Sequence, residues 1–303
     1  MYDIIIIGGG PAGLTAALYA RRANKSVLII EKGAFGGQIT FSPKVENIPG
    51  FLEVSGNEFA EKLVEQVMEQ GAEVECCEVL SIVDGEMKNV VTDDGEFEGK
   101  AVIIATGAKH RMLGLEREED FVGEGISFCA VCDGAFYTDK TVAVIGGGNS
   151  ALQEALLLAD LAKKVYVIQN LDFFTGEGKL VDQLAARENV EIILGTVVEK
   201  LLGETELMGI TVKHMADGSV QDLAVDGMFV AIGLVPQNDI FANVITLDER
   251  GYAQAGEDCL TSAEGIFVAG DCRVKKIRQV TTAAADGAIA ALAACDYIKE
   301  KNL

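Results

Sequence analysis

Near its start the chain reads Ile4-Ile-Ile-Ile-Gly8-Gly-Gly-Pro-Ala-Gly13. The isoleucine run is typical of a buried parallel strand, and residues 14–22 have the pattern of a helix. Glycines at this spacing make a tight turn that lets a pyrophosphate approach the backbone at the helix N-terminus. Glu31 lies at the end of the next apolar run, where a carboxylate can accept hydrogen bonds from a ribose. The stretch therefore predicts a βαβ unit that binds a dinucleotide.

The same pattern returns 138 residues later. The glycine spacing is repeated in Gly146-x-Gly148-x-x-Ala151, and Val165-Tyr-Val-Ile-Gln169 aligns with Val27-Leu-Ile-Ile-Glu31. Residues 141–145 are predicted to form a strand and residues 151–161 a helix. We therefore expect an α/β protein with two Rossmann-like three-layer domains.

The two copies differ in their recognition of a nucleotide ribose. The position of Glu31 in the first copy is occupied by Gln169 in the second, and Asp172 lies three residues beyond that register. A site for NAD usually has an acid at this position, whereas a site for NADP uses arginines to bind the 2′-phosphate. Position 169 carries no acid, the segment 169–175 contains no arginine, and the nearest base downstream is Lys179.

A pair of cysteines precedes the second glycine turn, in the sequence Cys129-Ala-Val-Cys132-Asp133. Cys-x-x-Cys beside a βαβ pattern indicates a redox-active dithiol, whose thiolate is the working nucleophile. Asp133 is suited to proton transfer if burial raises its pKa, and it could also cap a helix that begins near Gly134. A closed zinc site needs four ligands, and the chain has only two histidines and no second Cys-x-x-Cys, so we predict no metal.

Length and charge limit the remaining possibilities. The chain has 303 residues, 49% of them hydrophobic, which is enough for two cores. Its net charge of −22 argues against nucleic acid and against anionic membranes as partners. No apolar run reaches the ~20 residues that span a bilayer, and no leader segment is recognisable. The other five cysteines form no disulfide framework, so we expect a cytoplasmic protein.

Taken together, these residues show a resemblance that covers the whole chain. The chain resembles the low-molecular-weight thioredoxin reductases of the flavin-dependent disulfide reductase superfamily. The matching segments keep the order and spacing of that family: Gly8-Gly-Gly-Pro-Ala-Gly13, Gly36-Gly-Gln38, Glu46-Asn-Ile-Pro-Gly50, Ala105-Thr-Gly107, Cys129-Ala-Val-Cys-Asp133, Gly146-Gly-Gly-Asn-Ser-Ala151, Gly270-Asp271, Arg278-Gln-Val280 and Ala283.

The resemblance implies an FAD-binding domain formed by residues 1–113 and 244–303. The smaller domain inserted between them, residues 114–243, would resemble a pyridine-nucleotide-binding domain and carry the dithiol. In the family this domain rotates between two orientations, which would place hinges near Leu113-Gly114 and Asn243-Val244. The family is typically dimeric, so a homodimer is implied.

The resemblance also implies the roles of individual residues. Cys132 would face the flavin, Cys129 would attack the disulfide of thioredoxin, and Asp133 would complete the catalytic set. Asp271 would contact the ribityl chain, although an aspartate at a strand end could also cap a helix. Gln38 and Asn47 would lie near the flavin and residues 278–280 beside its ring system. The full FAD-binding set is Gly8, Gly10, Pro11, Ala12, Gly13, Glu31, Gly37, Gln38, Asn47, Ala105, Thr106, Gly107, Gly270, Asp271, Arg278, Gln279, Val280 and Ala283.

The chain departs from the family at the site of the electron donor. NADPH-dependent members carry His-Arg-Arg and a further arginine where this chain has Gln169-Asn-Leu171 and Thr175. Losing several charge-assisted bonds of ~1.5–3 kcal/mol each would weaken NADPH binding by several orders of magnitude. The chain thereby resembles the ferredoxin-linked branch of the family, which does not use pyridine nucleotides. NADH, or a pyridine nucleotide bound through other residues, remains the alternative.

Ferredoxins are usually acidic, so docking would require a basic patch on this acidic chain. The sequence offers Lys109-His110-Arg111, and Arg273 with Lys275, Lys276 and Arg278. A different class of function, a flavoprotein electron carrier or sensor, would not need the dithiol. Replacing Cys129 or Cys132 separates that class from a disulfide reductase.

Overall fold

The computed structural model describes every residue except residue 43. The chain forms two compact units: the first comprises Met1–Pro43, Ile48–Lys109 and Val235–Leu303, and the second comprises Lys44–Asn47 and His110–Leu234. Apart from the short segment 44–47, the chain crosses between the units at 109/110 and at 234/235, which is four and nine residues before the boundaries expected at 113/114 and 243/244.

The first crossing precedes residue 113 because Glu118 ties the following residues into the second unit. Its carboxylate accepts hydrogen bonds from the backbone N–H groups of Leu113, Gly114 and Leu115, at 2.7–3.1 Å. At both crossings the chain is extended, as β7 (Ala108–His110) and β16 (Leu234–Pro236), and these two strands pair with each other.

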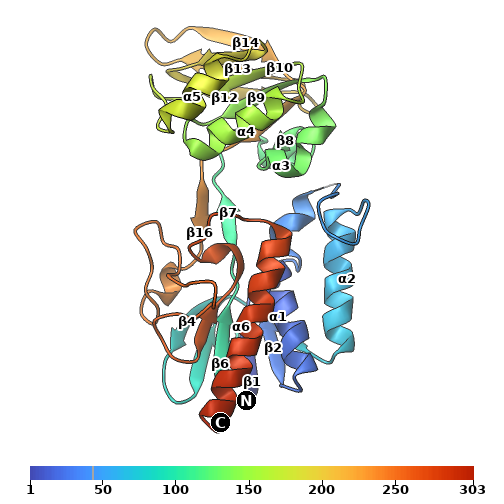
Figure 1. The fold of residues 1–303 in the computed structure, drawn as a ribbon, viewed down its shortest axis with the longest axis vertical. Coiled ribbons are helices and arrows are strands. Elements are labelled where there is room, and N and C mark those ends of the chain that lie inside the picture. Colours follow the sequence, from blue (N-terminus) through green and yellow to red (C-terminus); the bar gives the residue numbers. More distant parts are fainter. Residues whose placement is uncertain (43) are drawn as a thin grey trace. The chain divides into compact units, whose positions relative to one another are not determined.

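The first unit contains a mixed sheet with its α-helices packed on one face (Figure 1). Its remaining elements are β1 (Tyr2–Ile7), α1 (Pro11–Arg22), β2 (Val27–Ile30), η1 (Gly37–Phe41), α2 (Gly56–Glu69), β3 (Glu73–Glu75), β4 (Val79–Val83), β5 (Lys88–Thr92), β6 (Gly95–Ile104), η4 (Asp239–Phe241), β17 (Ile266–Val268), η5 (Gly270–Cys272) and α6 (Val280–Glu300). The strand order is β3-β2-β1-β6-β5-β4.

Strand β6 joins the two halves of this sheet. From Gly99 to Ile104 it pairs in parallel with β1, with Ala101 opposite Ile4, and its last residues also pair in parallel with β17. Its first residues pair antiparallel with β5, which continues into β4. Because β17 lies between residues 265 and 271, the return of the C-terminal segment to the first sheet, expected from the sequence, is confirmed.

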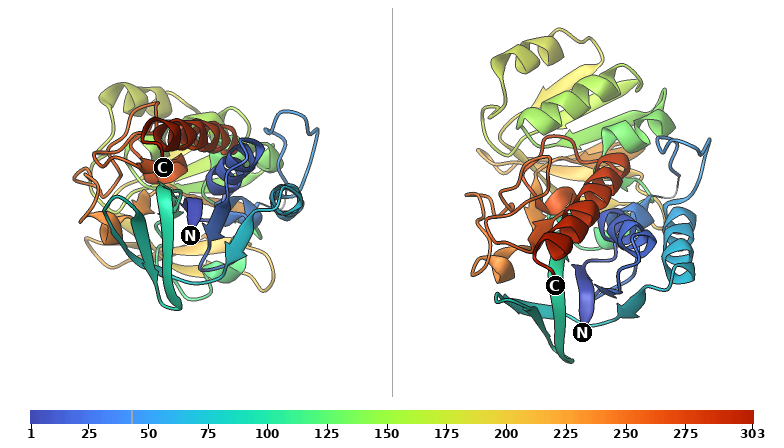
Figure 2. Two further views of the ribbon diagram at one scale, coloured as in Figure 1. Left: turned by 90° about the horizontal axis from the view of Figure 1, so that it is seen from below. Right: turned by 60° about the horizontal axis from the view of Figure 1, so that its bottom comes forward.

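Helices α1 and α6 lie side by side in the first unit, as Figures 1 and 2 show. Close approach is possible at Gly287, where any β-carbon would overlap the carbonyl oxygen of Ala12. Alanines that are fully buried line both helices, among them Ala16 and Ala290. The packing brings the N-terminus of α1 and the start of α6 close to the C-terminal ends of β1 and β17.

The second unit repeats the first βαβ arrangement. Its elements are β8 (Ile126–Ser127), α3 (Ala130–Asp133), β9 (Thr141–Ile145), α4 (Asn149–Ala159), β10 (Lys164–Ile168), α5 (Gly178–Ala185), β11 (Val190–Ile193), β12 (Thr196–Leu202), β13 (Gly209–His214), β14 (Val220–Ala224) and β15 (Gly227–Val230), with η2 (Glu119–Phe121) and η3 (Gly134–Tyr137). A parallel sheet has the order β11-β10-β9-β15-β8, and β12-β13-β14 form a separate antiparallel sheet.

The internal repeat predicted from the sequence is confirmed in this structure. Shifted by 138 residues, β1, α1 and β2 coincide within one or two residues with β9, α4 and β10. The α/β class and the two Rossmann-like units are therefore as predicted. Among the described helices, including the 21-residue α6, none is both long and apolar enough to cross a membrane.

Candidate functional site

The first glycine turn leaves an open cradle at the N-terminus of α1. Gly8 has φ +113°, and any β-carbon on Gly13 would overlap the Gly8 carbonyl oxygen, so both positions require glycine. Gly10, in contrast, would tolerate a β-carbon, which would make only an ordinary contact of 3.9 Å with Gly37 Cα. No side chain caps α1, which begins at Pro11, so its first backbone N–H groups can bind an anion.

Glu31 is held at the end of β2 by two backbone donors. Its Oε2 accepts a hydrogen bond of 2.7 Å from Gly9 N–H and its Oε1 one of 2.9 Å from Gly33 N–H. Each carboxylate oxygen retains a second lone pair, which can accept from a hydroxyl group. The acid is therefore fixed where the sequence predicts a ribose contact.

The turn after β17 lies against α1. Gly270 has φ +82°, and a β-carbon there would come within 2.8 Å of Ala12 Cβ. Asp271 follows in η5, and its Oδ1 is buried with no hydrogen-bond partner in the described chain. Burial raises the pKa of Asp271. The side chain does not cap a helix, since η5 already begins at Gly270, so the helix-cap alternative is wrong.

A buried ion-pair network holds this turn in place. Asp286 accepts hydrogen bonds from Gly270 N–H (3.0 Å), from Arg273 Nε and Nη2 (2.8 Å each) and from Lys275 Nζ (2.9 Å). The side chains of Arg273 and Lys275 are only 2% and 6% exposed. The expected basic docking patch is thus wrong at these two positions, because both cations are neutralised inside the unit.

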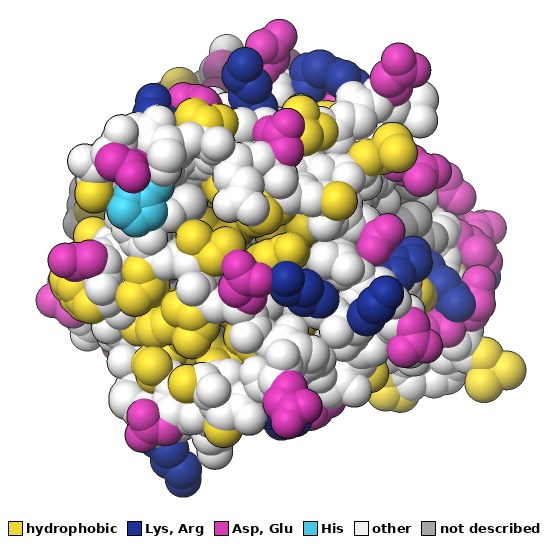
Figure 3. All heavy atoms as spheres, turned by 90° about the horizontal axis from the view of Figure 1, so that it is seen from above, with side chains coloured by type: hydrophobic (Ala, Val, Ile, Leu, Met, Phe, Trp, Pro, Cys, Tyr) yellow, Lys and Arg dark blue, Asp and Glu magenta, His cyan; other side chains and the backbone are white. Residues whose placement is uncertain are grey.

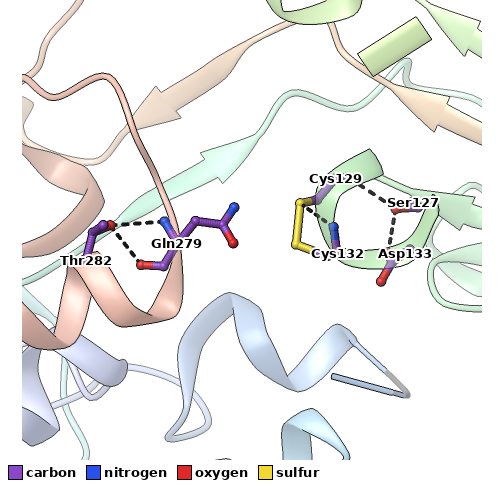
Figure 4. The surroundings of a disulfide bond; sticks show 6 residues. All are labelled: Ser127, Cys129, Cys132, Asp133, Gln279 and Thr282. Carbon is purple, nitrogen blue, oxygen red and sulfur yellow. Dashed lines mark hydrogen bonds between the residues drawn. A yellow bond between two sulfur atoms is a disulfide. The ribbon is translucent and has the colours of Figure 1, made fainter. Parts of the chain in front are cut away.

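The segment before α6 supplies further predicted flavin contacts. The Arg278 guanidinium stacks on Tyr252, with Cζ 4.5 Å from the ring centroid, and its Nε is buried without a partner in the described chain. Gln279 and Thr282 form a reciprocal capping box at the start of α6. Figure 4 shows its half in which the Thr282 hydroxyl bonds the Gln279 backbone. Val280 begins the helix, and Ala283 is buried on its inner face.

Other predicted residues of the FAD site occupy loops of the first unit. Ala105 is buried, Thr106 donates a 3.2 Å hydrogen bond to Asn238 Oδ1, and Gly107 has φ +67°. Gly37 and Gln38 begin η1, which follows the glycine turn. Asn47 belongs to the segment 44–47, which is grouped with the second unit, so its place beside the flavin stays a prediction.

The first unit fits a bound FAD. It offers a helix N-terminus without a side-chain cap, an acid at the end of β2, and two buried polar atoms, Asp271 Oδ1 and Arg278 Nε, that lack protein partners among the described residues. Buried polar groups are costly unless they are hydrogen-bonded, so such atoms point to a ligand. When bound, the flavin would supply two electrons.

Cys129 and Cys132 are joined by a disulfide in the second unit (Figure 4). Cys129 is the N-cap of α3, and its Sγ accepts a 3.2 Å hydrogen bond from Cys132 N–H. Ser127 Oγ accepts from Cys129 N–H at 3.1 Å. After reduction, the Cys132 N–H would stabilise a thiolate on Cys129, which favours Cys129 as the nucleophile.

Asp133 lies at the other end of the same turn. Its Oδ2 accepts a 2.6 Å hydrogen bond from the Ser127 hydroxyl, and its Oδ1 is buried without a partner in the described chain. Burial raises the pKa of Asp133, and the Ser127 hydrogen bond opposes that rise. Asp133 makes no side-chain cap to η3, so the capping role expected as an alternative is wrong. A buried carboxyl beside a dithiol is suited to proton transfer.

A second buried carboxyl beside the dithiol was missed in the sequence. Glu154 on α4 accepts a hydrogen bond from the backbone N–H of Ala130, between the two cysteines. Its position in the helix could have indicated burial. Ala151, Ala155 and Leu158 form the buried face of α4, and Glu154 lies on that face.

The second glycine turn has the same backbone as the first but a different side chain above it. Gly146 has φ +137°, and Gly147 carbonyl oxygen accepts hydrogen bonds from Thr175 N–H (2.9 Å) and Gly176 N–H (3.0 Å). Gln169 is buried against Gly147, and its Nε2 points to the Phe173 carbonyl oxygen at 3.4 Å. Residues 169–172 include no arginine or lysine. The acid among them, Asp172, is exposed.

The other expected basic patch is also weaker than its sequence indicates. His110 stacks on Phe128, with ring centroids 4.6 Å apart, and burial lowers the pKa of His110 to about 4. The ring is therefore neutral at pH 7. Only Lys109 and Arg111, which are exposed, contribute charge there.

A dinucleotide cradle in one unit and a Cys-x-x-Cys disulfide flanked by buried carboxyls in the other define a flavin-dependent disulfide oxidoreductase. The family described as pyridine nucleotide-disulphide oxidoreductase matches residues 2–287, and the chain belongs to this family.

Individual relatives agree with this assignment. The thioredoxin reductase of Listeria monocytogenes is 40% identical over 302 residues, which cover 99% of this chain and 95% of that protein. A "34.2 kDa protein in rubredoxin operon" of Clostridium pasteurianum is also 40% identical, with 99% and 98% covered. The crystal structure of thioredoxin reductase from Streptococcus pyogenes has a TM-score of 0.95 at 41% identity and 99% coverage of each chain. The resemblance stated from the sequence is confirmed, and the chain is an enzyme.

Proposed function

We propose that this protein is a thioredoxin-disulfide reductase that binds FAD and receives its electrons from ferredoxin or a similar small carrier. Cys129 attacks the disulfide of thioredoxin, Cys132 closes the intramolecular disulfide, and Asp133 handles the accompanying proton. The observation that carries the proposal is the Cys129–Cys132 disulfide, with the Cys132 N–H aimed at Cys129 Sγ and Asp133 buried beside it. The names of the relatives support thioredoxin as the substrate.

The choice of donor rests on the second glycine turn. Its backbone could still accommodate a pyrophosphate, as the family description would suggest. However, Gln169 can neither attract a 2′-phosphate nor replace the carboxylate that Glu31 presents in the first unit, and the segment 169–177 contains no Lys or Arg. Charge-assisted bonds to the phosphate supply much of NADP recognition, so their absence supports a protein donor.

Docking of an acidic donor would use the cations that the structure leaves exposed. Lys109, Arg111 and Lys276 are exposed, whereas Arg273 and Lys275 are committed to Asp286. On the face shown in Figure 3, basic and acidic side chains are interspersed and do not form a field of one sign. Association through a few local pairs would depend strongly on ionic strength.

A homodimer and a cytoplasmic location belong to the same proposal. The family resemblance supports the dimer. The five cysteines outside the redox pair are free, including the exposed Cys76, which agrees with a compartment that keeps thiols reduced.

The second candidate function is an NAD(P)H-dependent thioredoxin reductase with an altered nucleotide site. The retained turn favours it, because Gly146 and Gly148 keep the spacing of Gly8 and Gly10. An electron carrier or sensor without disulfide turnover is the third, and the disulfide argues against it.

The dithiol part of the proposal is tested by reducing the flavin anaerobically with dithionite, removing the excess, and adding oxidised thioredoxin. The flavin of the unsubstituted protein should be reoxidised, whereas C129S and C132S should leave it reduced. C76S, which removes an exposed free cysteine, is the matched control and should behave like the unsubstituted protein. Reoxidation at full rate in C132S would show that the dithiol does not carry the electrons.

A further inference from the structure

Glu154 is a charged residue on the buried face of α4. Ala151, three residues before it, and Leu158, four residues after it, lie on the same helix face and are each 0% exposed. Two of its atoms decide its role. Its carboxylate accepts a hydrogen bond from Ala130 N–H, and its Oε2 is buried with no partner in the described chain.

Ala130 connects this carboxyl to the dithiol. It immediately follows Cys129 and is the first residue of α3, which packs against α4. The Glu154 carboxylate is thus hydrogen-bonded to the N–H of the peptide group between Cys129 and Ala130. All of these residues belong to the second unit.

The other ionisable groups around α4 do not neutralise Glu154. The elements packed against α4 are α3, α5, β9, β10 and η3, and β9 carries no ionisable side chain. The groups on the others are Cys129, Cys132, Asp133, Tyr137, Lys164, Tyr166, Lys179 and Asp182. None of them contributes to the titration of Glu154: burial raises its pKa to about 7, and only the Ala130 hydrogen bond opposes that rise.

We infer that Glu154 is a positioning residue for thiol–disulfide exchange, which takes up a proton when the Cys129–Cys132 disulfide is reduced and releases it when the dithiol is reoxidised. The inference rests on the proposed role of Cys129 as the attacking thiol. It does not depend on which donor supplies the electrons.

Reduction of the Cys129–Cys132 disulfide consumes two electrons and, with Glu154, two protons. Two electrons from the flavin break the S–S bond, one sulfur takes a proton to become a thiol, and Cys129 remains a thiolate. An ionised Glu154 would then face a second negative charge in a buried site, so its carboxylate takes up a second proton. The Cys129 thiolate attacks the partner's disulfide, which forms a mixed S–S bond and releases the partner's first sulfur as a thiolate. The Cys132 thiol gives its proton to that thiolate and attacks Cys129, which restores the Cys129–Cys132 bond and releases the partner's second sulfur as a thiolate. The negative charge has then left the site, and Glu154 releases its proton.

The test measures alkylation of Cys129 by iodoacetamide in a C132S background, resolved by mass spectrometry of the Cys129 peptide. Rates are compared between pH 5.5 and pH 8 for C132S, for C132S with E154Q, and for C132S with E188Q. Gln can still accept the Ala130 N–H, so E154Q removes charge and keeps the hydrogen bond. Glu188 is an exposed acid of the same unit and serves as the matched control.

At pH 5.5, where Glu154 is protonated, the C132S and C132S/E154Q proteins should react at the same rate. Near pH 7, where Glu154 ionises and the Cys129 thiol is still titrating, C132S/E154Q should react about twofold faster, because removing a neighbouring charge lowers the pKa of the thiol by about half to one unit. At pH 8, where Cys129 is a thiolate in both proteins, the two rates should converge. C132S with E188Q should match C132S throughout.

A rate ratio that does not change with pH would overturn the inference, since a purely structural role of Glu154 would give that result. The C132S protein alone provides a second test that does not require E154Q to fold. Its Cys129 profile should show two ionisations, one of them near pH 7, and a single ionisation would contradict the inference. Failure of the proposed function would appear elsewhere, as thioredoxin reduction by C129S.

Discussion

Gln169 lies against Gly147 so closely that a β-carbon on Gly147 would come within 2.5 Å of the Gln169 side-chain carbon and nitrogen. At the corresponding position of the first unit, Glu31 accepts a 2.7 Å hydrogen bond from Gly9 N–H. The chain therefore contains its own internal comparison: two glycine turns with the same backbone, one with a fixed carboxylate and one with a neutral amide. This difference bears directly on the electron donor.

Restoring the basic residues of the NADPH-dependent relatives should restore the use of NADPH. We expect the variant Q169H/N170R/L171R/T175R to bleach its flavin with NADPH at least ~100-fold faster than the unsubstituted protein, because several charge-assisted bonds of ~1.5–3 kcal/mol would form. Stopped-flow absorbance of the flavin measures the rate. A variant with four Gln residues at these positions controls for disruption of the loop.

Asp133 should be needed for the transfer of electrons to the disulfide and not for flavin binding. Asp133→Asn keeps the size of the side chain and the bond from Ser127, but it removes the titrating group. Turnover with thioredoxin should fall about 10²- to 10⁴-fold, the usual contribution of a general acid or base. Asp139→Asn, at an exposed position with φ +60° that Asn tolerates, should retain full activity. Equal losses in both variants would contradict the assignment.

Asp286 should stabilise the flavin-binding unit. Burial alone would raise its pKa, but hydrogen bonds from Arg273 and Lys275 hold the pKa of Asp286 below its usual value. Asp286→Asn removes the buried counter-charge of Arg273 and Lys275, which should cost about 3–5 kcal/mol and reduce FAD retention on gel filtration. Because a depressed pKa stabilises the ionised native state, the difference in Tm should shrink as the pH falls below ~4.

The control for that experiment is Glu257→Gln. Glu257 also pairs with Arg273, at 3.4 Å, but its side chain is 91% exposed. Its loss should change stability by about 0–1 kcal/mol. If both substitutions lowered Tm equally, burial of the Arg273–Asp286 pair would not be what holds the turn.

Glu154 should make stability depend on pH in the opposite sense. Its pKa rises from 4.5 to about 7 in the folded chain, so the native state binds the proton more tightly than the unfolded state. Stability should therefore fall, by on the order of 3 kcal/mol, as the pH rises from about 4.5 to about 7. E154Q cannot lose a proton, so its Tm should exceed that of the unsubstituted protein at pH 8 and not at pH 5. A Tm difference that is the same at both pH values would contradict this.

Much of this molecule could be predicted from its sequence because its motifs are local. Strand, glycine turn and helix follow one another within about twenty residues, and the positive φ of Gly8 and the close packing of Gly13 leave little freedom of choice. Because the pattern returns 138 residues later, the same strand, turn and helix could be predicted for the second unit. The cysteine pair and Asp133 are adjacent in the chain, so their proximity needed no tertiary information.

The rest depended on contacts between distant segments. The neutralisation of Arg273 by Asp286 could not be read from the chain, since the bond joins η5 to α6. His110 is uncharged because Phe128 covers it, eighteen residues further on. The assignment of residues 44–47 to the second unit likewise depended on contacts with distant residues. Glu154, in contrast, left a signal in the helical spacing of α4 that could have been used.

The most direct test of the central claim is anaerobic bleaching of the flavin by stoichiometric NADPH, NADH or enzymatically reduced ferredoxin, each followed by oxidised thioredoxin. We predict rapid bleaching by ferredoxin alone, reversed by thioredoxin in the unsubstituted protein but not in C132S. Rapid bleaching by NADPH or NADH would contradict the proposed donor and show that the second glycine turn binds a nucleotide without the missing arginines.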